Sequence, residues 1–208
     1  METKERIIEV ATQLFREYGI KSVTMDDMAN QLSISKKTIY QFFKDKDEIV
    51  VMCTGKMLQE QEEEINRFRS EAKDIIDELI LIMEYFKKVL RVINPTFISD
   101  MEKYHPNAWK LFINHKDNCI KDTLMASMKR GVEEGFFRPD INIEILAKMR
   151  MEQTQLAFNQ RIFPFQKYDI FQIQVQFTEH FVLGLCTPKG YEKLTKYKNS
   201  QTNTYNAN

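Results

Sequence analysis

The sequence predicts an all-α protein, for two reasons. Glycine and proline, which mark hairpins and tight turns, number only six and five among the 208 residues. Leu, Ile, Met, Lys, Glu and Gln, which helices tolerate well, are by contrast plentiful. A chain of this length has room for one or two domains, so the order of the predicted helices must decide how it is organised.

The first predicted helix ends near Tyr18. Its apolar residues, among them Ile7, Ala11 and Phe15, fall on one helical face. Gly19 follows, and glycine is the residue that most readily adopts the left-handed cap at the end of a helix. This pattern predicts a helix that packs on one side only.

Two short helices follow. Thr24 and Asp27 have the spacing of a capping box, with Asp in place of the usual Glu or Gln, and predict the start of the second helix. Ser35 can cap a third helix over residues 36–43. We therefore expect a compact three-helix domain over residues 1–46.

Longer helices follow this unit and predict a larger bundle over residues 47–187. Recurring apolar residues place its helices at about residues 49–69, 74–93, 106–128, 143–161 and 169–185. From residue 198 the chain is polar, rich in Asn and too poor in apolar residues to bury much surface. Residues 188–208 are therefore expected to form a polar, disordered tail.

Composition excludes several classes of protein. The formal net charge is zero, so any attraction to nucleic acid must come from a local patch. The N-terminus lacks the apolar core of a signal peptide, and no run of about 18 apolar residues could span a membrane. Cys53, Cys119 and Cys186 are odd in number and far apart, as expected of buried thiols in a reducing compartment. We expect a soluble, cytoplasmic protein that does not bind membranes.

The sequence predicts no catalytic, metal or cofactor site. It contains no Ser nucleophile elbow and no glycine loop that could cradle a phosphate, so an enzyme is disfavoured. His105, His115 and His180 form no paired metal-ligand spacing, and no cysteine stands beside them at such a spacing. The acidic run at residues 62–64 is interpreted as a solvated helix face.

Residues 24–46 have the layout of a helix-turn-helix: a short helix, a tight turn, and a helix with one buried and one outward face. If Ile39 and Phe43 are buried, five polar side chains face outward: Lys36, Lys37, Thr38, Tyr40 and Gln41. In a major groove, Lys can reach guanine acceptors, Gln can pair with adenine and the Thr methyl can touch thymine. Residues 35–46 carry four Lys and one Asp, so the positive charge is concentrated where DNA would lie.

The order of residues in this region resembles the TetR family of bacterial transcriptional regulators. The residues that match its DNA-binding signature in order are Thr24, Ala29, Ile34, Ser35, Thr38, Ile39, Tyr40, Phe42, Phe43, Lys44, Lys46 and Glu48, and Phe15, Tyr18 and Gly19 match the end of the preceding helix. The stretch GVEEGFFRPDINIE at residues 131–144 is similar to the family's lead-in to its last two helices. The resemblance is close over residues 7–50 and elsewhere extends only to the number and length of helices.

The resemblance implies a dimer that reads double-stranded operator DNA. The residues that it implies for this contact are Thr24, Ser35, Lys36, Lys37, Thr38, Tyr40, Gln41, Phe42 and Lys46, with Thr24 and Lys46 on flanking phosphates. Two positions depart from the family's usual pattern. Lys37 stands where many members have Gly or another small residue, which suggests a distinct base preference, and Ser33 replaces the common Gly of the turn.

The resemblance also implies that the last two long helices, residues 143–161 and 169–186, pair with their twofold mates to form a homodimer. The residues spaced to supply such faces are Leu146, Met149, Gln153, Leu156, Gln160, Ile173, Phe177, Phe181 and Gly184. The same faces could instead serve only the core of one chain. A twofold interface needs a self-complementary surface, which favours the dimer.

Aromatic residues and Met are dense in the second domain, where they could line a cavity for a small, largely apolar effector or simply form the core. The candidate ligand-binding residues are Met83, Phe86, Tyr104, Trp109, Phe112, Glu152, Gln153 and Phe158. The predicted function is a repressor that binds a palindromic operator and is released by this effector. The alternative is a constitutive DNA-binding regulator without a small-molecule effector.

Overall fold

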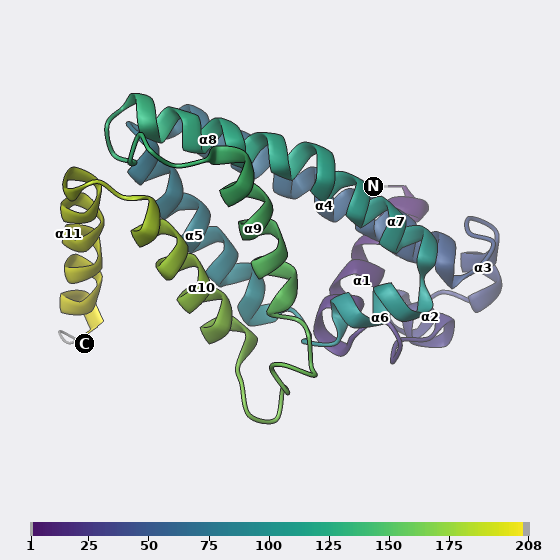
Figure 1. The fold of residues 1–208 in the computed structure, drawn as a ribbon. Coiled ribbons are helices and arrows are strands. Elements are labelled where there is room, and N and C mark those ends of the chain that lie inside the picture. Colours follow the sequence, from purple (N-terminus) through teal and green to yellow (C-terminus); the bar gives the residue numbers. More distant parts are fainter. Residues whose placement is uncertain (1, 206–208) are drawn as a thin grey trace.

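The structure is a computed structural model that describes residues 2–205, and over these residues it is built from helices and loops with one isolated β-bridge between Phe137 and Cys186 (Figure 1). The helices are α1 (Thr3–Tyr18), α2 (Met25–Leu32), α3 (Lys36–Tyr40), α4 (Lys46–Glu71), α5 (Ile75–Val92), α6 (Phe97–Tyr104), α7 (Pro106–His115), the π-helical segment η1 (Lys116–Ile120), α8 (Lys121–Glu133), α9 (Ile143–Leu156), α10 (Ile170–Leu185) and α11 (Pro188–Tyr205). The all-α prediction is confirmed. Within the described residues, no helix is both long and apolar enough to cross a membrane.

Helices α1–α3, here called the reading head, share a closely packed core. Side chains exposed by no more than 1% fill it: Ile7, Phe15, Met28, Ile39 and Phe43. Helix α3 ends at Tyr40, earlier than predicted, because the backbone N–H groups of Gln41 and Phe42 donate to carbonyls three residues back, on Thr38 and Ile39. Such bonds tighten the last turn into 3₁₀ geometry, so the α-helical part is shorter.

The reading head packs against helices that follow α5. Phe97 and Met101 of α6 are buried in the same cluster as the core of α1–α3. The backbone N–H of Lys21 also donates to the Asp100 carboxylate at 2.9 Å. Helix α4 begins next to the reading head and runs on beside α7 and α8, so it joins the two halves of the molecule (Figure 1).

A second core lies among α5, α8, α9, α10 and α11. Its buried members include Ile75, Ile76, Met128, Ala147, Phe181, Leu185 and Leu194. Glu78 is fully buried, and its carboxylate accepts hydrogen bonds from Ser127 Oγ at 2.6 Å and Arg130 Nη1 at 2.9 Å. These partners compensate a charge that would otherwise be costly to bury.

Other helices also differ from the prediction. Helix α6 was missed, and the single helix predicted over residues 106–128 is divided into α7, η1 and α8. A π-helical turn has wider i→i+5 bonding, which apolar spacing at 3.6 residues per turn does not report. Helix α9 ends at Leu156, and turns occupy the following residues up to Asp169.

The expectation of a disordered tail over residues 188–208 was wrong for its first part. Helix α11 starts at Pro188, which is well suited to the first turn of a helix because its missing N–H needs no partner there. Leu194 is buried in the second core, and Lys193 forms ion pairs with Asp77 of α5 and with Asp74, the N-cap of that helix. Residues 206–208 lie outside the described part of the chain.

Candidate nucleic-acid interface

Capping residues set the geometry of the helix-turn-helix. Thr24 Oγ1 accepts the backbone N–H of Asp27 at 3.2 Å, and the Asp27 carboxylate accepts the backbone N–H of Thr24 at 2.7 Å, which completes the capping box of α2. Ser35 Oγ accepts the N–H of Thr38 at 3.0 Å and caps α3. Between the helices, Ser33 has φ 54° and ψ 40°, and it is the only non-glycine residue with a positive φ in the described chain. A serine therefore makes the left-handed turn that a glycine would make with less strain.

Helix α3 has one buried and one outward face. Ile39 and Phe43 are 0% and 1% exposed, whereas Tyr40 is 49% and Phe42 38% exposed. The remaining outward residues are Lys36, Lys37 and Gln41, which are exposed, and Thr38, which is half-buried. The structure thus places the residues predicted to read bases together on the solvent side of one short helix.

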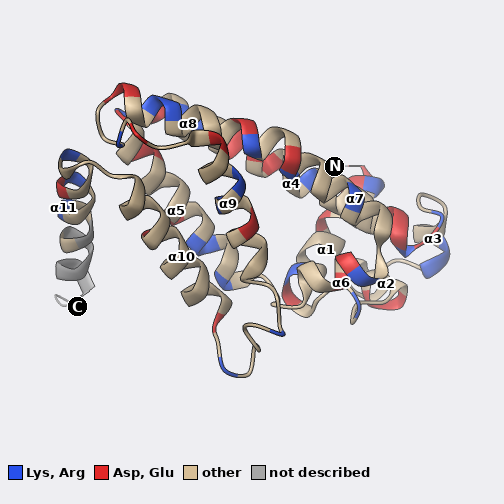
Figure 2. Cartoon of the chain, in the orientation of Figure 1, with Lys and Arg blue, Asp and Glu red and all other residues tan. Residues whose placement is uncertain are grey.

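Positive charge gathers on α3 at one end of the molecule (Figure 2). The ammonium group of Lys36 donates to Asp26 of α2 at 2.8 Å, and this hydrogen bond raises the pKa of Lys36. Lys37, by contrast, forms no ion pair with any residue that the structure describes. A phosphate would have to compete with Asp26 for Lys36, whereas Lys37 is free to contact DNA directly.

Lys46 lies in surroundings that the sequence did not predict. Its Nζ donates to the Ile20 carbonyl at 2.5 Å and lies 5.8 Å from the centre of the Phe15 ring. The side chain is half-buried, and this burial lowers its pKa. Lys46 therefore ties the start of α4 to the end of α1, a structural role that comes in addition to any contact with a phosphate. Thr24 is exposed, as a phosphate contact requires.

The residues predicted to bind an effector are spread over different surroundings. Trp109 and Phe112 stack with ring centres 5.4 Å apart and pack against the reading-head core. Tyr104 is 40% exposed between the ammonium groups of Lys21 and Lys103 and lines a surface hollow of about 380 Å³. These three aromatics thus lie where the second domain meets the reading head.

The other five candidates lie farther along the second domain. Met83, Phe86 and Phe158 are half-buried. Glu152 is exposed and accepts a hydrogen bond from Lys116 at 3.3 Å. Gln153 is half-buried, and its side-chain oxygen has no partner among the described residues. The structure does not gather these five with Tyr104 around the surface hollow.

A half-buried arginine lies between α9 and α10. The Nη2 of Arg150 donates to Thr178 Oγ1 at 2.6 Å, and its guanidinium lies 5.6 Å from the centre of the Phe181 ring. Its Nη1 is buried without a hydrogen-bond partner, and no acidic side chain of the described chain pairs with it. Burial lowers the pKa of Arg150 to about 10. Sequence analysis missed this residue because nothing near it in the chain indicates that its partner is absent.

Helix α9 presents an apolar stripe to solvent. Ile145 is 63%, Met149 40% and Leu156 36% exposed, and their spacing puts them on one helical face. Of the residues predicted for a dimer face on the next helix, Ile173 and Phe181 are instead buried within this chain. Gly184, Phe177 and the outward side of α10 remain exposed or half-buried.

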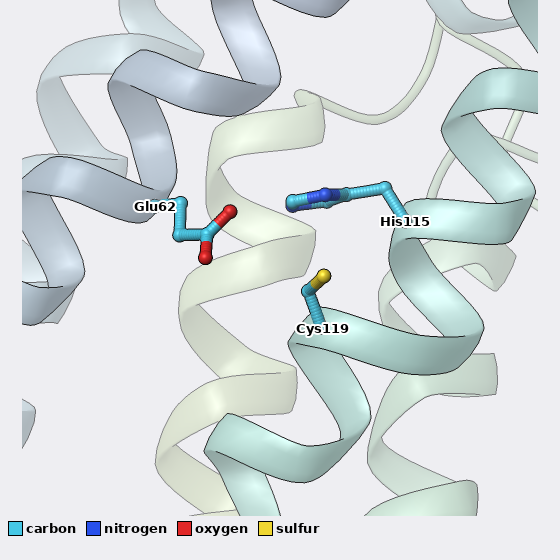
Figure 3. A group of neighbouring side chains, drawn as sticks. All are labelled: Glu62, His115 and Cys119. Carbon is cyan, nitrogen blue, oxygen red and sulfur yellow. The ribbon is translucent and has the colours of Figure 1, made fainter.

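Sequence analysis also missed a group of three side chains that could hold a metal ion. Glu62 of α4, His115 of α7 and Cys119 of η1 each offer one ligand atom, and these atoms lie within 4.8 Å of one another (Figure 3). The signal in the sequence was the four-residue spacing of His115 and Cys119, which puts both on one side of a helix. Glu62 could not have been added, because it lies on a helix distant in the sequence.

Comparison with protein families gives a match for the N-terminal region. Residues 7–53 match the family described as bacterial regulatory proteins, tetR family. The matched residues contain the whole helix-turn-helix and the first part of α4.

Relatives and solved structures extend the similarity to the rest of the chain. YhgD and YvaF of Bacillus subtilis, both named as uncharacterized HTH-type transcriptional regulators, are similar to it. YhgD is 27% identical over 67% of this chain and 74% of its own length. YvaF is 24% identical over 50% of this chain, and the match spans only 55% of its own length. The structure of the transcriptional regulator FadR from Bacillus subtilis in complex with stearoyl-CoA has the same fold, with a TM-score of 0.62, 16% identity and coverage of 87% of this chain and 98% of FadR.

Proposed function

This chain belongs to the TetR family of bacterial regulatory proteins and is a DNA-binding transcriptional regulator, and from this premise we propose that it is a homodimeric repressor. In this proposal the reading head, within residues 1–46, binds one half of a palindromic operator. The rest of the chain, including residues 47–187, supplies the dimer interface and binds a small, largely apolar effector that releases the DNA.

The outward face of α3 carries the proposal for DNA binding. Lys37, Tyr40 and Gln41 are exposed on a helix whose other face is fixed by the buried Ile39 and Phe43. A rigid helix with exposed cationic and amide groups can enter a major groove and form hydrogen bonds with base edges. Tyr40 adds a hydroxyl that can reach a phosphate or a base.

The exposed stripe on α9 supports the dimer. An apolar row such as Ile145, Met149 and Leu156 is costly to leave in water, and a twofold axis beside it would bring the same row from a second copy into contact. The half-buried and exposed residues of α10 continue this surface. The two reading heads of such a dimer would contact half-sites about one helical turn, roughly 34–36 Å, or a multiple of it apart.

Sequencing the genomic DNA that the purified protein retains would test operator binding. The expected result is a small set of near-palindromic sites, bound by a species with twice the mass of the chain in analytical ultracentrifugation. Equal affinity for one half-site and for the full site, with a monomer in solution, would contradict the proposal.

Arg150 indicates the chemistry of the effector. Arg150 is half-buried, and a buried Nη1 atom without a hydrogen-bond partner is costly, so an anionic group on a ligand that paired with it would be favourable. The neighbouring rings and methyl groups of the second core suit an apolar chain. We therefore propose an effector that combines an apolar body with a carboxylate or phosphate, a class that includes the acyl-CoA in the FadR structure.

Fluorescence of Trp109, the only tryptophan, offers the readout for this effector. Fatty acids and acyl-CoA esters would be titrated into the protein with and without saturating operator. If a ligand weakens operator binding by some factor, it must bind the operator-bound protein more weakly than the free protein by the same factor. Arg150→Met should weaken binding of the anionic ligand by at least about tenfold, the value of a charged hydrogen bond, whereas Lys148→Met on the exposed side of α9 should not.

Two outcomes would count against an effector of this kind. If ligand affinity is the same with and without operator, the molecule bound is not an effector, and the chain is better described as a constitutive regulator. If Arg150→Met and Lys148→Met bind the anionic ligand equally well, Arg150 does not recognise it.

A further inference from the structure

Glu62, His115 and Cys119 point into one small space between α4 and the α7–η1 segment (Figure 3). Their ligand atoms lie within 4.8 Å of one another. Atoms bound to one tetrahedral zinc ion lie roughly 3–4 Å apart, given metal–ligand distances of about 2.0–2.3 Å. Glu62 is exposed, so its side chain is free to move closer to the other two ligands when a metal ion binds.

The three side chains have no competing partner. None of them forms a hydrogen bond or ion pair with any residue between 2 and 205, and Cys119 is a free thiol. The neighbouring Lys116 is directed elsewhere, because its ammonium group donates to Gln155 at 2.8 Å and to Glu152 at 3.3 Å on α9. The site therefore keeps its donor atoms available, and the nearby ammonium group of Lys116 is paired with side chains of α9.

The backbone at this site has an unusual form. His115 is the last residue of α7, and Cys119 lies in the π-helical segment that follows. This segment, KDNCI, contains neither glycine nor proline, so neither residue accounts for the wide turn. Single π-helical turns inside longer helices occur frequently at functional sites.

The donor set identifies the class of metal. One thiolate, one imidazole and one carboxylate suit zinc and related divalent transition metals, whereas magnesium and calcium prefer oxygen ligands throughout. Three protein ligands leave a fourth tetrahedral position for water or a small ligand. That arrangement allows the ion to exchange more readily than in a closed four-ligand site.

We propose that Glu62, His115 and Cys119 bind a divalent transition metal of the zinc class, and that the bound ion clamps α4 to α7 and η1. Helix α4 starts at the reading head, and α7 packs against it along much of its length. Fixing this contact restricts how the reading head moves relative to the second domain. Metal occupancy therefore changes operator affinity; this second step rests on the proposed function, whereas metal binding itself does not.

Cobalt titration of the reduced, full-length protein tests the site. We expect one equivalent of Co²⁺ to bind with a thiolate-to-cobalt charge-transfer absorption, and Zn²⁺ to displace it. Cys119→Ser should abolish this absorption, and His115→Ala and Glu62→Gln should each weaken Zn²⁺ binding at least about tenfold. The matched controls are Cys186→Ser, His180→Ala and Glu63→Gln, which should bind the metal as the parent does.

The outcomes separate the two steps. No metal binding, or unchanged binding after Cys119→Ser and His115→Ala are combined, would overturn the site. Metal that binds as described but leaves operator affinity unchanged would overturn the clamp and leave the site standing. A chain that binds zinc but no operator would instead contradict the proposed function. In the expected result, zinc shifts operator affinity of the parent by about fivefold or more, and operator shifts zinc affinity by the same factor.

Discussion

The reading head and the α9–α10 pair differ in how far contacts within one chain bury their apolar side chains and pair their polar groups. In the reading head, Ile39 and Phe43 are buried, and the helix starts are capped by Thr24 and Ser35. On α9, Ile145 is 63% exposed, and the nearby Arg150 and Gln153 keep unpaired buried atoms. The reading head buries its apolar side chains and caps its helices without a partner, and its exposed face is available to DNA. The α9–α10 pair has exposed apolar side chains and unpaired polar groups, which other molecules would cover or pair.

If a second copy of the chain covers the exposed apolar stripe of α9, substitutions in this stripe should have the largest effect on operator binding. Ile145→Asp combined with Met149→Asp should give a monomer, because each aspartate would place a charge in the apolar interface. Operator affinity should then fall toward the non-specific level, roughly a thousandfold or more. Ultracentrifugation and fluorescence anisotropy with labelled operator measure the two effects.

Val92→Asp provides the matched control, since Val92 on α5 is also 63% exposed. It should remain dimeric and bind the operator. Position 145 lies in the first turn of α9, where an acidic residue is favourable to the helix, so loss of folding is not expected to explain the result. A double variant that stays dimeric would show that α9 is not the interface.

A substitution of Gln41 tests the exposed surface of the reading head. Its side chain is exposed, so Gln41→Ala should leave the melting temperature unchanged. If the amide pairs with a base, affinity should fall by about 1–3 kcal/mol, with the loss confined to one or two operator positions. Binding to a library of operator variants would reveal this pattern. An equal loss on every sequence would assign Gln41 to the phosphate backbone instead.

Lys37 on α3 and Lys46 at the start of α4 allow a contact with DNA to be distinguished from a role in stability. Lys46→Met removes the donor to the Ile20 carbonyl and should lower the free energy of unfolding by about 1–3 kcal/mol. Lys37→Met should leave stability unchanged, weaken operator binding and reduce its dependence on salt. Chemical denaturation and binding at several salt concentrations distinguish the two. If Lys46→Met changed only the salt dependence, Lys46 would be a phosphate contact alone.

Local signals explain why the reading head could be predicted from the sequence. The Thr24–Asp27 box, the Ser35 cap and the burial of Ile39 and Phe43 each depend on residues within a few positions of one another. The structural role of Lys46 was not predicted, because its hydrogen-bond partner, the Ile20 carbonyl, is 26 residues away. Sequence spacing carries no information about such a contact.

The second domain was less predictable because its decisive contacts join distant helices. Leu194 looked like part of a polar tail, yet it is buried in a core formed by helices far earlier in the chain. Arg150 is an ordinary charged residue in the sequence, and only the packing of α10 shows that it lacks an acidic partner. Glu62 joins His115 only once α4 and α7 are side by side.

The smallest expected effect is on the pH dependence of stability, and it distinguishes the N-terminal caps of α2 and α9. The Thr24 hydroxyl and backbone N–H both donate to the Asp27 carboxylate, and these hydrogen bonds lower the pKa of Asp27 below its ordinary value of 3.8. Because the folded state holds the carboxylate charged, this stabilisation is complete above the ordinary pKa and is lost as the pH falls through the lowered one. The cap of α9, Asn142, does not titrate, so this cap contributes no such dependence.

Melting temperatures of the parent and of Asp27→Asn, measured from pH 6 to about pH 2.5, would isolate this contribution. The amide of the variant cannot ionise, so the parent should be the more stable of the two at pH 6, and the gap between them should close as Asp27 protonates. All other carboxyl groups titrate in both proteins and cancel in the difference. Asn142→Asp should do the reverse at α9, because it gives that cap a carboxylate whose stabilising effect appears only above its pKa. A gap that stays constant across this range would mean that the charge of Asp27 contributes nothing to the start of α2, and that its side chain acts only as a neutral acceptor.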